Sequence, residues 1–128
     1  MREFAYHIFR VLKTTMDRIS TGEAQPRTAG LNLPGRSYES FEKIAEYGAE
    51  VLAEYSLWAK EQDVEALRAA PSEGSTMRSG AEQLDQAGGH TTQHLRQLYF
   101  MLEKYGIEPE NRLPDSELPP EYVLTILW

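Results

Sequence analysis

The chain has 128 residues, of which 20 are acidic and 13 basic, and its formal net charge is -7. This length suits one domain with a modest core, and the lack of any long Lys/Arg cluster argues against nucleic acid as a partner. The chain has no cysteine, which excludes disulfides, thiolate metal sites and a cysteine nucleophile. The N-terminal residues contain no apolar stretch of signal-peptide length, and no segment approaches the ~20 apolar residues that span a bilayer. We therefore expect a soluble, cytoplasmic protein without a membrane partner.

The first half of the chain predicts two helices separated by a loop. Apolar residues recur at steps of three and four over residues 2–20, which predicts a helix that ends at Gly22. Residues 22–36 are punctuated by glycine and proline and are expected to form a loop. A second amphipathic helix is predicted from an N-cap at Ser37 to about residue 62. Its apolar stripe comprises Phe41, Ile44, Gly48, Val51, Tyr55 and Trp58.

The second half of the chain predicts one further long helix. Residues 63–75 contain a proline and a glycine and are expected to form a loop or a single frayed turn. Ser79 and Glu82 have capping-box spacing, which predicts a helix from there to Tyr105 with Gly106 as its C-terminal stop. Its predicted core stripe comprises Leu84, Ala87, Thr91, His94, Leu98, Met101 and Tyr105.

These patterns predict a single all-α domain over residues 1–128, an up-and-down helical bundle of three long helices plus a proline-rich tail. Three amphipathic helices cover one another's apolar stripes only in part, so we expect a homodimer to complete the bundle. The alternative is that the tail folds back over the open groove and gives a monomer. The candidate residues for the dimer surface are Phe9, Leu12, Met16, Trp58 and Tyr99.

The chain contains three histidines, His7, His90 and His94. Residues 90–94 read H-T-T-Q-H, and residues four apart on a helix lie on the same face, so both imidazoles can bind one ion. The third ligand must come from another element, which leaves His7 on the first helix. Three neutral imidazoles leave coordination positions for water or substrate, as in catalytic zinc-type sites. The alternative is a chance pair on one helix and an ordinary boundary histidine on the other.

Two better-known metal sites are excluded by the residues beside these histidines. Thr91 follows His90 directly, so the glutamate base of an H-E-x-x-H metalloprotease is absent. A carboxylate-bridged di-iron bundle requires glutamate three residues before each histidine, but those positions hold Phe4, Ala87 and Thr91.

Two adjacent glycines, Gly88 and Gly89, lie within the predicted third helix directly before His90. Two glycines inside a helix cost roughly 2 kcal/mol relative to alanine. Either they leave space beside the metal for a ligand or a neighbouring helix, or they mark a kink or a later helix start.

The segment G-G-H-T-T-Q-H-L-R-Q-L-Y-F-M-L-E-K-Y-G-I, residues 88–107, resembles the last core helix of the DinB-like (YfiT-like) superfamily. The family helix carries an H-x-x-x-H pair followed by Q-L and a leucine run that ends at Gly-Ile. The context A-Y-H-I-F-R around His7 is similar to that of the family's remaining ligand, and the tail L-P-D-S-E-L-P-P-E-Y-V resembles the ending of some members. Relative to the family, we expect the preceding first helix to be absent, and Gly89 stands where many relatives have a bulky aromatic residue.

The resemblance implies a metal-binding four-helix-bundle fold with His7, His90 and His94 as ligands of a divalent ion, zinc or nickel. It also implies a metal-dependent enzyme that acts on a small-molecule substrate, either an S-transferase using a low-molecular-weight thiol or a hydrolase. The alternative function is a non-catalytic metal-binding bundle that serves assembly or ligand binding. An enzyme should keep an open coordination position, whereas a structural site should be closed by a fourth protein ligand such as Glu3 or Asp85.

Overall fold

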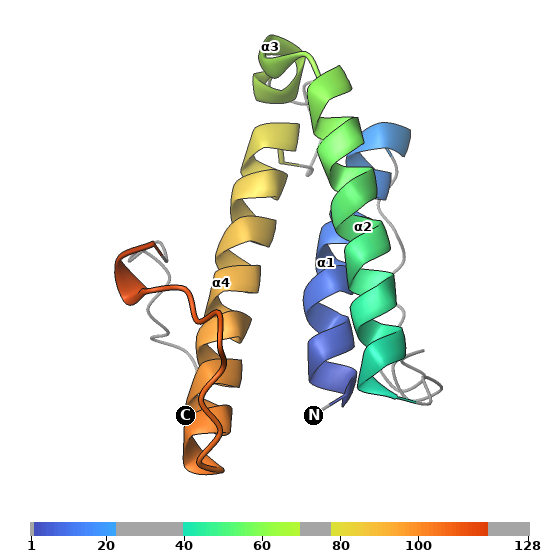
Figure 1. Cartoon of the computed structure of the whole chain (residues 1–128). Coiled ribbons are helices and arrows are strands. Elements are labelled where there is room, and N and C mark those ends of the chain that lie inside the picture. Colours follow the sequence, from blue (N-terminus) through green and yellow to red (C-terminus); the bar gives the residue numbers. More distant parts are fainter. Residues whose placement is uncertain (1, 23–39, 70–77, 118–128) are drawn as a thin grey trace.

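The computed structural model describes residues 2–22, 40–69 and 78–117, and within these the chain is helical without strands. In these three ranges, four α-helices and one 3-10 turn follow one another (Figure 1). They are α1 (Arg2–Thr21), α2 (Phe41–Glu61), α3 (Val64–Arg68), α4 (Gly80–Lys104) and the turn Asp115–Glu117. The predicted all-α class and the three long helices are confirmed. None of the helices in the described ranges is long and apolar enough to cross a membrane.

The predicted end of α1 and both predicted ends of α4 are confirmed by their capping geometry. Gly22 follows α1 with a φ of +68°, a left-handed conformation that favours glycine at a helix end. At the start of α4, the Ser79 side chain accepts the Glu82 backbone N–H while the Glu82 carboxylate accepts the Ser79 N–H, which is a complete capping box. After α4, Gly106 has a φ of +70°, and the N–H of Ile107 donates to the Leu102 carbonyl at 3.0 Å in a Schellman motif.

Two predictions about the middle of the chain need correction. The N-cap of α2 is Ser40, whose Oγ accepts the Lys43 N–H, and not Ser37, which lies outside the described residues. Both serines could act as caps, but Ser40 directly precedes the stripe that begins with Phe41. The stretch predicted as a loop or frayed turn contains α3, whose N-cap Asp63 accepts the Glu65 N–H at 2.9 Å.

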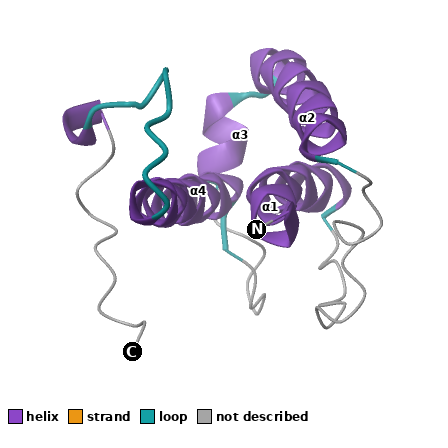
Figure 2. Cartoon of the chain, turned by 60° about the horizontal axis from the view of Figure 1, so that its bottom comes forward, coloured by secondary structure: helices purple, strands orange, loops and turns teal. Residues whose placement is uncertain are grey.

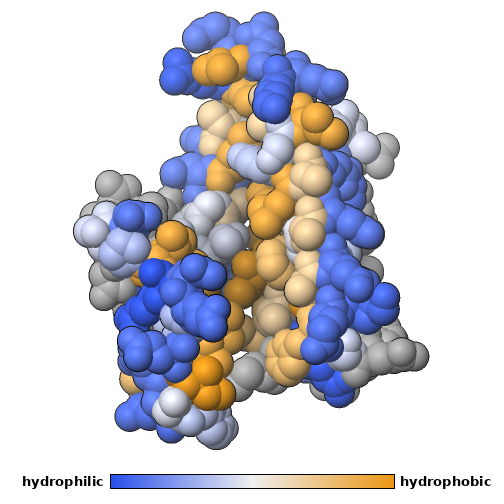
Figure 3. Space-filling view, in the orientation of Figure 1, coloured by the Kyte–Doolittle hydropathy of each residue, from blue (hydrophilic) through white to orange (hydrophobic). Residues whose placement is uncertain are grey.

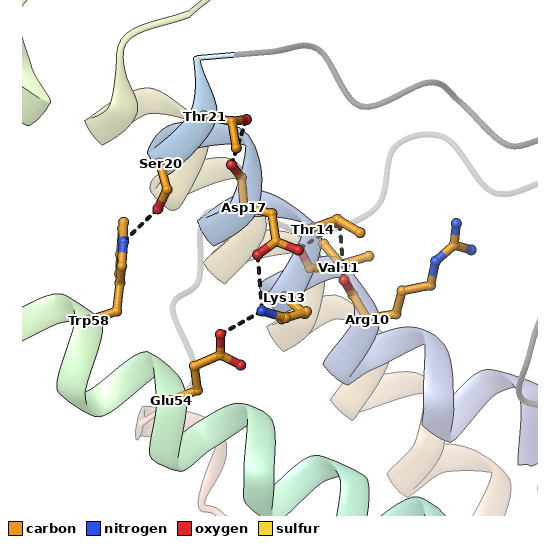
Figure 4. Close-up of polar contacts among 9 residues, drawn as sticks. All are labelled: Arg10, Val11, Lys13, Thr14, Asp17, Ser20, Thr21, Glu54 and Trp58. Carbon is orange, nitrogen blue, oxygen red and sulfur yellow. Dashed lines mark hydrogen bonds and ion pairs between the residues drawn. The ribbon is translucent and has the colours of Figure 1, made fainter.

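The direction of α2 also differs from the predicted up-and-down bundle, because α1 and α2 run parallel. Lys13 forms an ion pair with Glu54 at 2.5 Å, and one to two turns further along both helices Trp58 Nε1 donates to Ser20 Oγ at 2.9 Å (Figure 4). An up-and-down bundle needs a short connection between successive helices. Residues 22–40 are long enough for an extended chain to return along the roughly 30 Å length of α1, so they permit a crossover.

By contrast, α4 runs antiparallel to α1. His90 on α4 contacts His7 near the start of α1, whereas a Cβ on Gly80 at the start of α4 would lie 3.5 Å from Ile19 near the end of α1. α1 packs extensively on both α2 and α4, and α3 packs on α4, but α2 and α4 share no comparable interface. Viewed towards the ends of the helices, α1 lies at the corner between its two neighbours (Figure 2).

The core is built around α1. The buried apolar residues of the core within the described ranges are Tyr6, Ile8, Met16, Ile44, Val51, Ala87 and Tyr99. The space-filling view shows a hollow between α2 and α4, with apolar residues along its walls (Figure 3). The bundle is therefore closed around two sides of α1 and open between the other two helices.

Tyr99, and not the predicted Tyr105, is the buried tyrosine of α4. Tyr105 is 73% exposed at the C-cap, whereas Tyr99 is 8% exposed. Tyr99 lies nine positions after His90, which is two and a half helical turns, so it projects from the opposite side of α4. The segment after α4 covers it there: the Leu113 N–H donates to the Tyr99 hydroxyl at 3.2 Å and the Arg112 guanidinium lies over the ring.

Three residues of the predicted dimer surface are already used inside the single chain. Met16 and Tyr99 are buried, and the Phe9 ring fills the space above Gly48 on α2. The assignments of Met16 and Tyr99 are therefore wrong, whereas Phe9 is half-buried. The other two candidate residues, Trp58 and Leu12, are half-buried, and Trp58 donates a hydrogen bond to Ser20.

The two helix glycines Gly48 and Gly88 provide a matched test of the packing. A Cβ at Gly48 would lie 2.5 Å from the Phe9 ring, so Gly48→Ala should destabilise the chain by about 1 kcal/mol or more, because displacing a packed ring outweighs the gain in helix propensity. A Cβ at Gly88 would meet nothing within 4 Å, so Gly88→Ala should stabilise it by about 0.5 to 1 kcal/mol. Urea unfolding followed by circular dichroism measures both. Equal shifts of the same sign would contradict the close α1–α2 contact.

Candidate metal centre

The structure brings the three predicted histidines together from two helices. His7 lies on α1, and His90 and His94 lie one turn apart on the facing side of α4. The Nε2 atom of His90 lies 3.3 Å from Nε2 of His7 and 3.0 Å from Nε2 of His94. The antiparallel packing of α1 on α4 thus converts one sequence-local pair and one distant histidine into a single cluster.

The spacing of these nitrogens fits a small divalent cation. Nitrogen ligands about 2.0 to 2.1 Å from a tetrahedral zinc ion are separated from one another by about 3.3 to 3.4 Å. All three candidate ligand atoms lie within 4.8 Å of one another. No other His, Cys, Asp or Glu in the described ranges joins this group, so neither Glu3 nor Asp85 closes the site as a fourth ligand.

Gln97 sets the orientation of the His94 ring. Its Oε1 lies 2.7 Å from His94 Nδ1, and since an amide oxygen only accepts, that nitrogen carries the proton. The lone pair of His94 is then on Nε2, the atom that faces the other two histidines. The Phe4 ring packs edge-on against the same imidazole, with centroids 4.9 Å apart. A hydrogen bond to the outer nitrogen is the usual support of a metal-binding histidine.

The cluster favours neutral imidazoles. Burial, followed by the nearby charges of His94 and His7, lowers the pKa of His90 to about 4. Burial, followed by His94 and Arg10, also lowers the pKa of His7. A metal ligand must be neutral imidazole, so near pH 7 the environment of both residues maintains the form that binds a cation.

The lone pairs and hydrogen bonds of the three imidazoles also suit a bound metal ion. If all three Nε2 atoms present lone pairs to one point, these repel one another, and a cation at that point removes the repulsion. His90 Nδ1 is buried and has no hydrogen-bond partner among the described residues, so the orientation of this ring depends on the Nε2 side. The three residues therefore fit a divalent ion with imidazole affinity such as zinc or nickel.

Gly88 and Gly89 do not interrupt the helix that carries the pair. α4 is continuous from Gly80 to Lys104, so the interpretation as a later helix start is wrong. Gly88 is exposed and faces open space, whereas Gly89 is buried. No described group packs closely enough on Gly88 to require glycine there.

No family model matches this chain, and the searches of curated proteins and of solved structures found no match. The fold and the site themselves define a helical protein with a cluster of three histidines between two antiparallel helices. Two residues of the site, Gln97 and Phe4, were not predicted from the sequence. Gln97 lies three residues after His94 on the same helix, and this spacing is the signal that could have indicated it. Phe4 contacts His94 from the other helix, so no sequence spacing indicates that contact.

We predict that the metal-free chain loses stability as the pH falls from about 6.5 to about 4. The folded pKa of His90 is about 4, below the usual 6.5, so the unfolded chain binds protons in this range more readily than the folded chain. The contribution of His90 is complete above pH 6.5 and is lost as the pH falls through the window. Urea midpoints measured in EDTA at several pH values test this, and His90→Gln should flatten the dependence. An unchanged slope in that variant would contradict it.

We also predict that Gln97→Ala weakens metal binding about 10- to 100-fold, because the His94 ring loses the partner that fixes its proton on Nδ1. Gln97→Glu keeps an acceptor at the same place and should retain the affinity. Gln93→Ala, on the same helix and also half-buried, is the matched control. Competition titration with a zinc chelator measures all three. Equal affinities of the wild type and Gln97→Ala would show that Gln97 does not support the site.

Proposed function

We propose that the protein is a cytoplasmic, metal-dependent enzyme of the DinB-like type, a thiol S-transferase or a hydrolase that acts on a small molecule. The observation that carries this proposal is the convergence of three imidazole nitrogens from α1 and α4 without a fourth protein ligand among the described residues. The resemblance of residues 88–107 to the last core helix of that superfamily supports the same reaction class.

In this proposal the chain's own residues hold and shield the site. His7, His90 and His94 would hold the ion, and Gln97 keeps the His94 lone pair directed inward. Phe4 packs on His94 and excludes water from one side of its ring. A zinc-type ion held by three neutral imidazoles supplies a nucleophile near neutral pH by lowering the pKa of the water or thiol at its open position.

The alternative function is a non-catalytic bundle in which the metal joins α1 to α4. A structural zinc site is typically closed by four protein ligands, and three ligands are typical of catalytic sites. The three-ligand set therefore favours the enzyme. Whether a thiol or water is the nucleophile is decided by which class of substrate the metal-loaded protein converts.

We predict that the chain binds one equivalent of zinc or nickel with metal–nitrogen distances of about 2.0 to 2.2 Å. The metal should raise the melting temperature, because it binds the folded chain in preference to the unfolded one. His90→Ala and His94→Ala should each abolish both effects, whereas Gln93→Ala should preserve them. Element analysis, X-ray absorption and thermal melts provide the measurements. Less than a tenth of an equivalent in metal-loaded wild-type protein would refute the site.

The enzymatic proposal is tested on metal-loaded protein with two substrate panels. One pairs low-molecular-weight thiols with electrophilic acceptors and detects thioether formation, and the other contains esters and amides and detects hydrolysis. Activity in one panel that disappears in His94→Ala and survives in Gln93→Ala would support the enzyme and identify the nucleophile. Stoichiometric metal binding with neither activity would favour the non-catalytic alternative.

A further inference from the structure

A continuous uncharged stripe runs along the exposed side of α2. It consists of Phe41, Ala45, Ala49, Leu52, Ser56 and Ala59, spaced by three or four residues, so they share one face of the helix. All six are exposed, and the two large members, Phe41 and Leu52, are 50% and 49% exposed. The single hydroxyl in the stripe is already satisfied, because Ser56 Oγ donates to the Leu52 carbonyl at 2.8 Å.

This stripe lies beside the residues that bind α2 to α1 and apart from the charged side of the helix. Ile44, Gly48 and Val51 are buried against the rest of the bundle, and Phe9 covers Gly48. In the space-filling view, apolar residues follow the side of α2 that faces α4, and hydrophilic residues follow its outer side (Figure 3). The stripe is thus an exposed apolar face of α2 beside its contact with α1.

We propose that this stripe is a self-association surface, on which α2 of a second copy of the chain packs antiparallel across a two-fold axis close to residue 50. Two-fold pairing requires a surface that is complementary to itself when its direction is reversed. Both the sizes and the charges of the residues on α2 satisfy this condition.

The size pattern is complementary under reversal. A two-fold axis near residue 50 places Phe41 of one copy opposite Ala59 of the other, and Leu52 opposite Ala49. Ala45 and Ser56, both small, then face each other. Each large side chain meets a small one, which is how facing helices interdigitate without voids or overlap. In a parallel pairing in register, the two Phe41 rings would meet and the alanines would leave gaps.

The charges at the two ends of the stripe are also complementary under reversal. Glu42 and Lys60 are both exposed and lie eighteen residues apart, which is five full helical turns, so they project from the same flank of α2. Reversal places Glu42 of each copy opposite Lys60 of the other and forms two ion pairs. This pattern identifies a second copy as the occupant, because the partner needs the same stripe with an opposite charge at each end.

Sedimentation equilibrium of the full chain from about 1 to 300 μM tests the proposal. We expect the mass to rise with concentration towards twice 14.6 kDa. Leu52→Glu should weaken association at least tenfold, because it places a charge at the centre of the pairing. The matched control is Leu57→Glu on the same helix, since Leu57 is exposed but lies off the stripe. A mass of 14.6 kDa at every concentration, or equal effects of the two variants, would overturn the proposal.

A charge exchange tests the antiparallel register without introducing a charge into the apolar stripe. Glu42→Lys and Lys60→Glu should each weaken association about three- to tenfold, and the double variant should restore it to within about twofold of the wild type. If the double variant stays as weak as the singles, antiparallel pairing of α2 is excluded. Circular dichroism of each variant is the control for folding. The metal site lies on α1 and α4, so metal binding in the same variants separates this surface from the proposed function.

Discussion

The contact between α1 and α4 determines where the three imidazoles meet, and the same helix α1 also holds α2. Two residues of α1 that are two positions apart serve the two interfaces: His7 faces the histidine pair of α4, and Phe9 fills the space above Gly48 of α2. A rotation of α1 that improved one contact would disturb the other, since side chains on a helix turn together by 100° per residue. The site is therefore positioned by a helix that is fixed from two sides, which is the rigid support that a three-ligand centre needs.

The cluster carries an electrostatic cost within the folded chain. Burial disfavours the charged form of His90 and His7, and the neighbouring His94 further lowers the pKa of both. The cluster thus presents neutral donors near pH 7, but the buried Nδ1 of His90 lacks a hydrogen-bond partner among the described residues. Unsatisfied buried groups are uncommon in folded proteins and concentrate where a ligand or ion completes the site. The same features that weaken the free chain at low pH favour a cation at neutral pH.

The sequence predicted the clustering of the three histidines better than it predicted the topology. The pair His90 and His94 follows from helical spacing, and His7 follows because the chain has one further histidine, so little tertiary information was needed. Periodicity reports which face of a helix is apolar but not the direction of its neighbours, which is why parallel α1 and α2 were not predicted. Tyr99 was missed for a related reason, since the segment after α4 covers a face that lies outside the interhelical stripe.

The two helices that flank α1 depend on it to different degrees. α4 has three kinds of support: α1 on one side, α3 near its start, and the returning segment with Arg112 over Tyr99. Among the described helices, α2 has one extensive interface, with α1, reinforced by the Lys13–Glu54 pair and the Trp58–Ser20 hydrogen bond. Those polar contacts are solvent-exposed and contribute modestly, and most of the stability of a helix in a protein comes from packing of its apolar face. Only part of the apolar surface of α2 is packed on α1, because the stripe that includes Phe41 and Leu52 remains exposed. A second helix on that stripe would supply the packing that α2 lacks and leave the histidines, held between α1 and α4, in place.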